Sequence, residues 1–146
     1  MPSLEAHESA CAHIHGYASL FGIPDSMGDV VFAGAFRRGL LGRGALPMLL
    51  DHDPQRPAGI WTEIYEDARG LFVRGEVRAD RRGAGQARLA LERGLDGLSI
   101  GFTLTDWRAR ADGGRDLLAI HLWEVSLVDT PMLPQARLIR AIPAPV

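Results

Sequence analysis

The chain has 146 residues, of which 47% are hydrophobic and 23% are charged, and its formal net charge is −2. This length is typical of one domain that can bury a real core, and the near-neutral charge argues against a nucleic-acid or acidic-membrane partner because no large positive field is available. The single cysteine, Cys11, excludes an internal disulfide framework and is typical of a reducing compartment.

The N-terminal segment does not have the features of a targeting signal. Residues 1–10 have neither a basic start nor the apolar run of a signal peptide, and no apolar stretch approaches the length of a membrane span, about eighteen residues. We expect a protein of the cytosol, with a flexible tail over 1–12, one domain over 13–140 and a C-terminal tail over 141–146. In this polar N-terminal stretch, Cys11 is interpreted as a spectator thiol rather than a nucleophile.

The first third of the chain predicts two strands and a short helix. Residues 13–21 (HIHGYASLF) alternate enough for a first strand, which the turn signals from Gly22 onward close. A second short strand is expected over 29–32. Residues 34–41 (GAFRRGLL) are typical of one or two helical turns that end at Gly42.

The rest of the chain predicts five further strands and one helix. In order, these are a short buried strand over 46–51, a hairpin over 59–65 and 70–79, a helix over 84–93 stopped by Gly94, and two clear strands over 98–106 and 117–128. The strands are not regularly separated by long helices, which argues against a doubly wound parallel sheet. The pattern favours a mainly β (α+β) fold, with roughly seven strands in a closed or nearly closed antiparallel barrel flanked by a few short helices.

The strand over 97–105 (GLSIGFTLT) carries a candidate nucleophile. Side chains alternate between the two faces of a strand, so Leu98, Ile100, Phe102 and Leu104 are predicted to share one apolar face in the core. The opposite face holds only small or polar residues, and Ser99 stands on it where an extended substrate can approach.

The same residues, 97–101, match the G-x-S-x-G pattern of a nucleophile elbow. We reject that match because an elbow lies between a strand and a helix, whereas this strand continues past Ser99 and the later histidine, His121, follows within 22 residues. On this pattern alone, a structural serine that fits between two glycines is the simpler interpretation.

His52 is the candidate general base. It stands where a buried strand opens into a loop, so its backbone is held while its ring stays accessible. The neighbouring carboxylates of Asp51 and Asp53 are expected to raise its pKa. The alternative interpretation is a surface histidine in a turn.

Glu124 is the candidate orienting acid. It interrupts the apolar strand over 117–128, where a carboxylate is costly unless it has a hydrogen-bonded partner. That partner is either a catalytic histidine or an arginine in a core ion pair, and the residues leave both open. His121 is the rival third member, but it is predicted to face the other side of the strand. We expect no cofactor and no metal, because His13, His15, His52 and His121 have no completing ligand motif.

Taken in order, these segments resemble the prohead maturation proteases of tailed phages, which are related to the herpesvirus assemblin proteases. The resemblance runs from about Gly16 to Leu138. Each motif is weak alone, but their shared order is a strong signal. The segments that carry it are 16–22 (GYASLFG), 28–31 (GDVV), 34–36 (GAF), 49–53 (LLDHD), Gly70-Leu71, 97–102 (GLSIGF) and 124–128 (EVSLV), followed by Pro131 and Ala136.

The resemblance implies a herpesvirus-protease-like barrel and a serine endopeptidase with Ser99 as nucleophile and His52 as base. By position, its third catalytic residue falls on Glu124, where the assemblin relatives use a second histidine. The oxyanion hole is expected in the loop over 130–135, at residues other than its two prolines, which have no N–H to donate.

The family's substrate is the major capsid protein with its scaffolding segment, which is cut inside the assembling prohead in the bacterial cytoplasm. The resemblance implies an enzyme that is commonly a precursor that also cuts itself, with relatives that self-associate. Longer relatives carry a further C-terminal region, which we expect this chain to lack. Either a phage or a gene transfer agent fits this sequence. The alternative functions are a non-catalytic capsid assembly or scaffold-binding protein of the same fold, and a hydrolase of esters or small amides.

Overall fold

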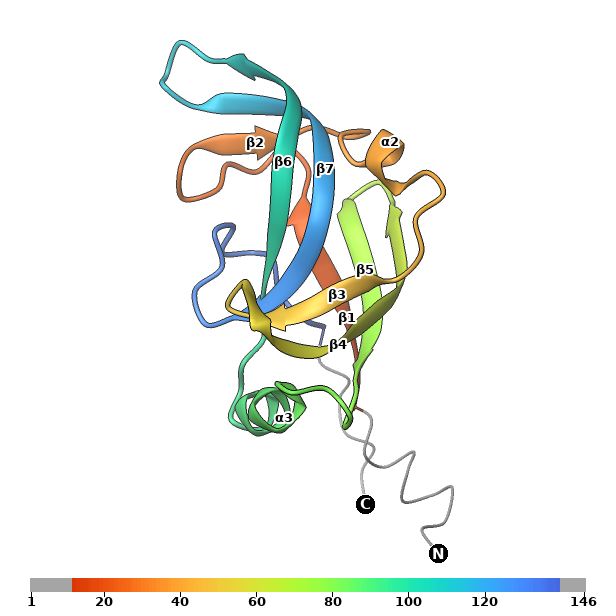
Figure 1. Cartoon of the computed structure of the whole chain (residues 1–146). Helices are drawn as coiled ribbons and strands as arrows, with labels where there is room; N and C mark the ends of the chain where they lie inside the picture. Colours follow the sequence, from red (N-terminus) through yellow and green to blue (C-terminus); the bar gives the residue numbers. More distant parts are fainter. Residues whose placement is uncertain (1–11, 140–146) are drawn as a thin grey trace, which may run out of the picture.

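The computed structural model describes residues 12–139, which form one curled seven-stranded sheet with two helices (Figure 1). The predicted tails over 1–12 and 141–146 lie outside these residues, apart from Ala12, and so does Cys11. The elements in chain order are β1 (Ala12–Leu20), β2 (Asp29–Val31), α2 (Arg37–Leu40), β3 (Leu46–Leu50), β4 (Asp53–Glu66), β5 (Gly70–Val77), α3 (Ala84–Glu92), β6 (Gly97–Ala109) and β7 (Arg115–Val128).

The sheet is mixed, so the prediction of a purely antiparallel barrel is wrong in this respect. Its strand order is β1-β5-β4-β3-β7-β2, and β6 pairs with β7. Most neighbours are antiparallel, but β2 and β3 both run parallel to β7. The alternation of side chains along a strand reveals which residues share a face. It does not reveal which other strand pairs with it, or whether the two run parallel or antiparallel. A parallel pair needs a long crossover, which β4, β5, α3 and β6 provide between β3 and β7.

Residues 136–139 bridge the two edge strands β1 and β6. The N–H of Leu98 donates to the carbonyl of Ala136 at 2.9 Å, and the N–H of Ile139 donates to the carbonyl of His15 at 2.9 Å. Isolated bridges pair Gly97 with Arg137 and Gly16 with Leu138. This segment links the two edges only through isolated bridges, so the curled sheet is a half-barrel rather than the closed or nearly closed barrel that the strand pattern predicts.

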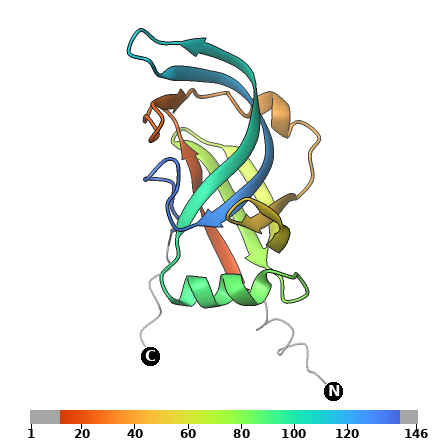
Figure 2. The ribbon, with the colours of Figure 1, turned by 60° about the vertical axis from the view of Figure 1, so that its left-hand side comes forward.

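The core fills the inside of this curled sheet. Its largest fully buried side chains include Trp61, Phe36, Met48 and Leu98, and the indole N–H of Trp61 donates to the carbonyl of Val125 at 3.0 Å. Figure 2 shows α3 lying across one end of the sheet. The helix ends at Glu92, and Gly94, two residues further on, has the positive φ of 105° that suits the expected glycine stop.

Strand β4 begins six residues earlier than predicted, at Asp53 rather than at residue 59. The prolines Pro54 and Pro57 hide this stretch from the sequence pattern, because proline interrupts a ladder and is tolerated only at edges and bulges. The pairing of β4 with β3 is indeed irregular here, with register shifts on both sides of Leu49.

Beyond Gly101, β6 and β7 run on as a hairpin, seen at the top of Figure 1. The prediction of a fully apolar core face on β6 is therefore wrong past this point. Leu98 is buried, but Phe102 is 37% exposed and Leu104 is half-buried. A bulge between Gly101 and Phe102 breaks the alternation. None of the helices within residues 12–139 is long and apolar enough to cross a membrane.

Candidate active site

His52 lies in a strained turn between β3 and β4. Asp51 and His52 have φ angles of 49° and 60°, in the left-handed region that costs roughly 1–2 kcal/mol for each residue with a side chain. Two hydrogen bonds hold the turn: the N–H of Asp51 donates to the carbonyl of Leu127 at 3.1 Å, and the N–H of His52 donates to Oγ of Ser126 at 2.9 Å. Strain of this kind clusters at functional sites.

The ring of His52 bridges the other two candidate residues. Its Nε2 lies 3.0 Å from Oγ of Ser99 on β6, and its Nδ1 lies 2.5 Å from Oε1 of Glu124 on β7. Both distances are within hydrogen-bonding reach, as a nucleophile, a base and an orienting acid require. Glu124 on β7, His52 in the turn and Ser99 on β6 therefore form one continuous chain of polar contacts.

Glu124 is nearly buried, with 8% of the residue exposed. Among residues 12–139, its partners are His52 and Ser126, so within this part of the chain the alternative prediction of a core ion pair with an arginine is wrong. Space for the carboxylate comes from Gly101, which lies opposite Glu124 in the register of β6 and β7. A Cβ atom at position 101 would overlap with Oε1 of Glu124.

The pKa of His52 is raised above its ordinary value, as its neighbours predict, but Glu124 is the main cause. The hydrogen bond that His52 donates to Glu124 has the largest effect; partial burial opposes it, and the charges of Glu124 and Asp51 add to it. Asp53 is not among the causes. Its carboxylate instead accepts from the N–H of Gln55 at 2.9 Å and from Nε of Arg56 at 3.1 Å.

Ser126 is the residue of this site that the sequence analysis missed. Its hydroxyl donates to Oε2 of Glu124 at 2.6 Å and accepts the N–H of His52, and the residue is fully buried. The available signal was the spacing of Glu124 and Ser126: two polar residues at i and i+2 share one face of a strand that is otherwise apolar.

The other candidate histidines lie elsewhere. The ring of His121 packs edge-on against Trp123 with centroids 4.4 Å apart, and its Nε2 lies 3.4 Å from Nη1 of Arg43. On β1, His13 lies 3.8 Å from a carboxylate oxygen of Glu76. Within residues 12–139, no group of three or more histidine, cysteine or acidic residues is arranged to hold a metal ion.

Ser99 and His52 open into a groove of about 240 Å³. Its floor and walls are largely apolar and include Leu98, Leu117 and Leu133. Its charged lining residues are Asp25, Asp29 and Arg115. Such a groove, apolar with a few placed polar groups, suits the binding of a peptide side chain.

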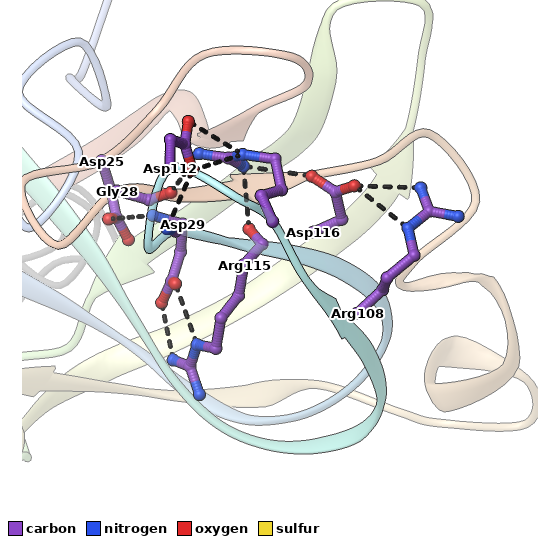
Figure 3. Close-up of polar contacts among 9 residues, drawn as sticks. Asp25, Gly28, Asp29, Arg108, Asp112, Arg115 and Asp116 are labelled. Atoms are coloured by element: carbon purple, nitrogen blue, oxygen red, sulfur yellow. Dashed lines mark hydrogen bonds and ion pairs between the residues drawn. The ribbon is translucent and has the colours of Figure 1, made fainter.

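A network of arginine and aspartate side chains stiffens one wall of the groove (Figure 3). Arg115 forms a forked pair with Asp29, at 2.9 and 2.7 Å. In the same network, Arg108 and Arg110 both donate hydrogen bonds to Asp116. These two hydrogen bonds are the main reason that the pKa of the Asp116 carboxyl group is lowered. Nη2 of Arg110 also donates to the carbonyl of Gly28 at 2.7 Å. The loop between β1 and β2 is thereby tied to the β6–β7 hairpin.

Comparison with known proteins identifies the family. Residues 2–143 match the caudovirus prohead serine protease family. The chain belongs to this family. The prohead protease of Enterobacteria phage HK97 is 36% identical over 92 residues, which cover 61% of this chain and 41% of that protein. The chain thus matches about two-fifths of the length of this curated relative.

Solved structures show that the prohead protease fold is shared more widely. The bacteriophage T4 capsid assembly protease superposes with a TM-score of 0.62 at 16% identity, over 80% of each chain. The KSHV protease, solved in complex with a hexapeptide phosphonate inhibitor, gives a TM-score of 0.59 at 14% identity, over 87% of this chain and 63% of the other. At these identities the likeness is one of fold, and it agrees with the resemblance to herpesvirus proteases.

Proposed function

We propose that this prohead protease is a serine endopeptidase in which Ser99 is the nucleophile, His52 the general base and Glu124 the orienting acid. The observation that carries the proposal is the continuous chain of contacts from Glu124 through His52 to Ser99, at 2.5 and 3.0 Å, at the mouth of a peptide-sized groove. Membership of the prohead serine protease family supports it.

The reaction follows from this order of contacts. Nε2 of His52 accepts the hydroxyl proton while Oγ of Ser99 attacks the carbonyl carbon of the peptide bond. The imidazolium then gives the proton to the leaving amine, and water hydrolyses the acyl-enzyme by the same route. Glu124 holds Nδ1 in its protonated form and stabilises the imidazolium, which a low-dielectric site makes effective.

The loop over 130–135 is the proposed source of oxyanion-hole donors. Met132 and Leu133 line the groove beside Ser99. The loop is anchored because the N–H of Ser26 donates to the carbonyl of Met132 at 2.8 Å, and Pro131 packs beside Gly97. The N–H groups of Met132 and Leu133 are therefore the donors that we propose for the developing oxyanion.

The substrate segment is proposed to be an extended polypeptide. Among residues 12–139, β6 pairs with β7 along one edge, while its other edge is bonded to residues 136–137 only at Gly97 and Leu98. The edge next to Ser99 is thus open to strand addition, which aligns a peptide by main-chain hydrogen bonds.

The biological substrate that we propose is the major capsid protein with its scaffolding segment, cut inside the assembling prohead in the bacterial cytoplasm. The family and its HK97 member, a prohead protease, support this substrate class. Self-association and self-cleavage remain predictions from the resemblance.

Co-expression with the major capsid protein of the same phage or gene transfer agent tests the proposal. Intact mass is expected to show the capsid protein shortened at one N-terminal site with the wild type, and full-length with Ser99→Ala. If shells assemble but the capsid protein stays intact in both samples, the non-catalytic scaffold-binding alternative is favoured. Equal shortening in both samples would remove Ser99 from the chemistry.

Gly101→Ala is expected to damage the site by displacing Glu124, since the added methyl overlaps with its carboxylate. Overpacking of this kind costs about 1–3 kcal/mol of stability. Misplacement of the acid should slow the reaction of Ser99 with diisopropyl fluorophosphate by about 100-fold, measured by intact mass over time. Gly85→Ala is the matched control, because position 85 is in open space on α3. Unchanged labelling of the Gly101 variant would contradict the need for a glycine there.

A further inference from the structure

Ser126 connects the base and the acid of the site through one hydroxyl group. Its Oγ lies 2.9 Å from the backbone nitrogen of His52 and 2.6 Å from Oε2 of Glu124. The residue is completely buried, and it lies directly opposite Ser99 in the register of β6 and β7. It does not line the groove, so it acts on the reaction only through its neighbours.

The direction of these two hydrogen bonds is fixed by chemistry. A hydroxyl has one proton to donate, and a backbone N–H can only donate. Oγ of Ser126 therefore accepts from His52 and gives its proton to the carboxylate of Glu124. Because each bond polarises the next, the two strengthen one another.

This arrangement satisfies both oxygens of a nearly buried carboxylate. Oε1 of Glu124 receives Nδ1–H of His52, and Oε2 receives the hydroxyl of Ser126. A buried carboxylate with an unpaired oxygen is costly and is driven to rotate or to take up a proton. Ser126 thus favours the ionised, correctly rotated form that can hold Nδ1–H.

The same hydroxyl also holds the backbone from which the base projects. Asp51 and His52 both have positive φ angles, 49° and 60°, a conformation that side-chain-bearing residues keep only when the surroundings enforce it. The hydrogen bond from His52 N–H to Ser126 is one of the two main anchors of this turn, together with that from Asp51 N–H to Leu127.

We propose that Ser126 is a positioning residue, which holds the Glu124 carboxylate and the His52 backbone in register so that the imidazole reaches Ser99. This inference rests on the proposed function, since it assigns Ser126 a part in the same reaction. Ser126 touches neither the substrate nor the reacting atoms.

The first test is the rate at which Ser99 is phosphorylated by diisopropyl fluorophosphate. In this reaction Oγ of Ser99 bonds to phosphorus, fluoride leaves, and the hydroxyl proton passes to His52. For Ser126→Ala we expect the maximal labelling rate to fall about 10- to 100-fold, with the concentration for half-maximal rate changed less than threefold. Ser126→Thr, which keeps the hydroxyl, should restore most of the rate. Val73→Ala, which removes buried volume on β5, is the control for lost stability and should label at the wild-type rate.

The second test does not depend on catalysis. The charged groups that act on His52 are Glu124 and Asp51, and Ser126→Ala removes neither residue. A changed pKa of His52 would therefore report that the Glu124 carboxylate has rotated or taken up a proton. In an NMR titration of the histidine rings, the pKa of His52 should fall toward its ordinary value in Ser126→Ala and stay raised in Val73→Ala. An unchanged titration together with unchanged labelling would overturn the inference. If the wild type itself does not label, the proposed function fails, while the titration still decides the role of Ser126.

Discussion

His52→Asn is expected to slow the reaction of Ser99 with diisopropyl fluorophosphate by about 10⁴-fold, because among residues 12–139 His52 is the base that lies within hydrogen-bonding reach of the Ser99 hydroxyl. Asparagine is preferred to alanine here, since position 52 has a φ of 60° and asparagine tolerates the left-handed region. The variant should therefore keep its fold while losing its base. The measurement is intact mass against time, with Ser99→Ala defining zero labelling.

His121→Ala is the matched control for this experiment. His121 was the rival third member in the sequence, but its ring contacts Trp123 and Arg43 instead of His52. We expect its labelling rate to stay within about twofold of the wild type. A His121 variant as slow as the His52 variant would contradict the proposed assignment, as would a folded His52 variant that labels at the wild-type rate.

Glu124→Gln is expected to lower the same rate by about 10³- to 10⁴-fold, although the side chain keeps its shape. The reason lies in the proton of Ser126. Because Oγ of Ser126 accepts from the N–H of His52, its own proton points to position Oε2. A glutamine amide must then place its oxygen toward Ser126 and its NH₂ toward Nδ1 of His52. The ring is forced into the tautomer with its proton on Nε2, which cannot accept the proton of Ser99.

The pH dependence of this pair gives a second expected result. His52 is an effective base only when neutral, so labelling by the wild type should rise through its raised pKa, above the ordinary value of 6.5. Replacement of Glu124 removes the largest cause of that shift and destabilises the imidazolium. In the Glu124→Gln variant, the rise of the labelling rate with pH (the acid limb of its pH profile) should therefore move to lower pH.

The control for Glu124→Gln is Glu63→Gln, which removes an exposed carboxylate that pairs with Arg74 at 3.0 Å. Its labelling rate and acid limb should both match the wild type, since exposed ion pairs contribute little. The assignment of Glu124 would be contradicted by a Glu124 variant with an unmoved acid limb and a rate within about tenfold of the wild type.

The positions of the elements could largely be read from the sequence. Local patterns carry this information: β1, β3, β5 and α3 each begin or end within a residue or two of the predicted bounds, because alternation and glycine stops are properties of neighbouring residues. Strand β4 was predicted too short, since its prolines are accommodated at an irregular pairing with β3 that no local pattern reveals.

Part of the candidate site could likewise be predicted from the sequence, and part could not. Ser99, His52 and Glu124 each stood out as a polar residue in a conspicuous place, and the resemblance to prohead proteases named them together. Ser126 did not stand out, because a serine in a strand is ordinary until its partners are known. Its role depends on the backbone of His52, 74 positions away in the chain.

By itself, the sequence determined a mainly β chain of about seven strands and a resemblance to the family to which it belongs, and it offered three candidate residues for acyl transfer. Only the tertiary structure decided that β2 and β3 run parallel to β7, that β6 leaves the core beyond Gly101, and that Glu124 pairs with His52 rather than with an arginine. The physical reason is that side-chain periodicity is set between neighbours along the chain, whereas strand partners and buried polar contacts are set by pairing across long sequence separations.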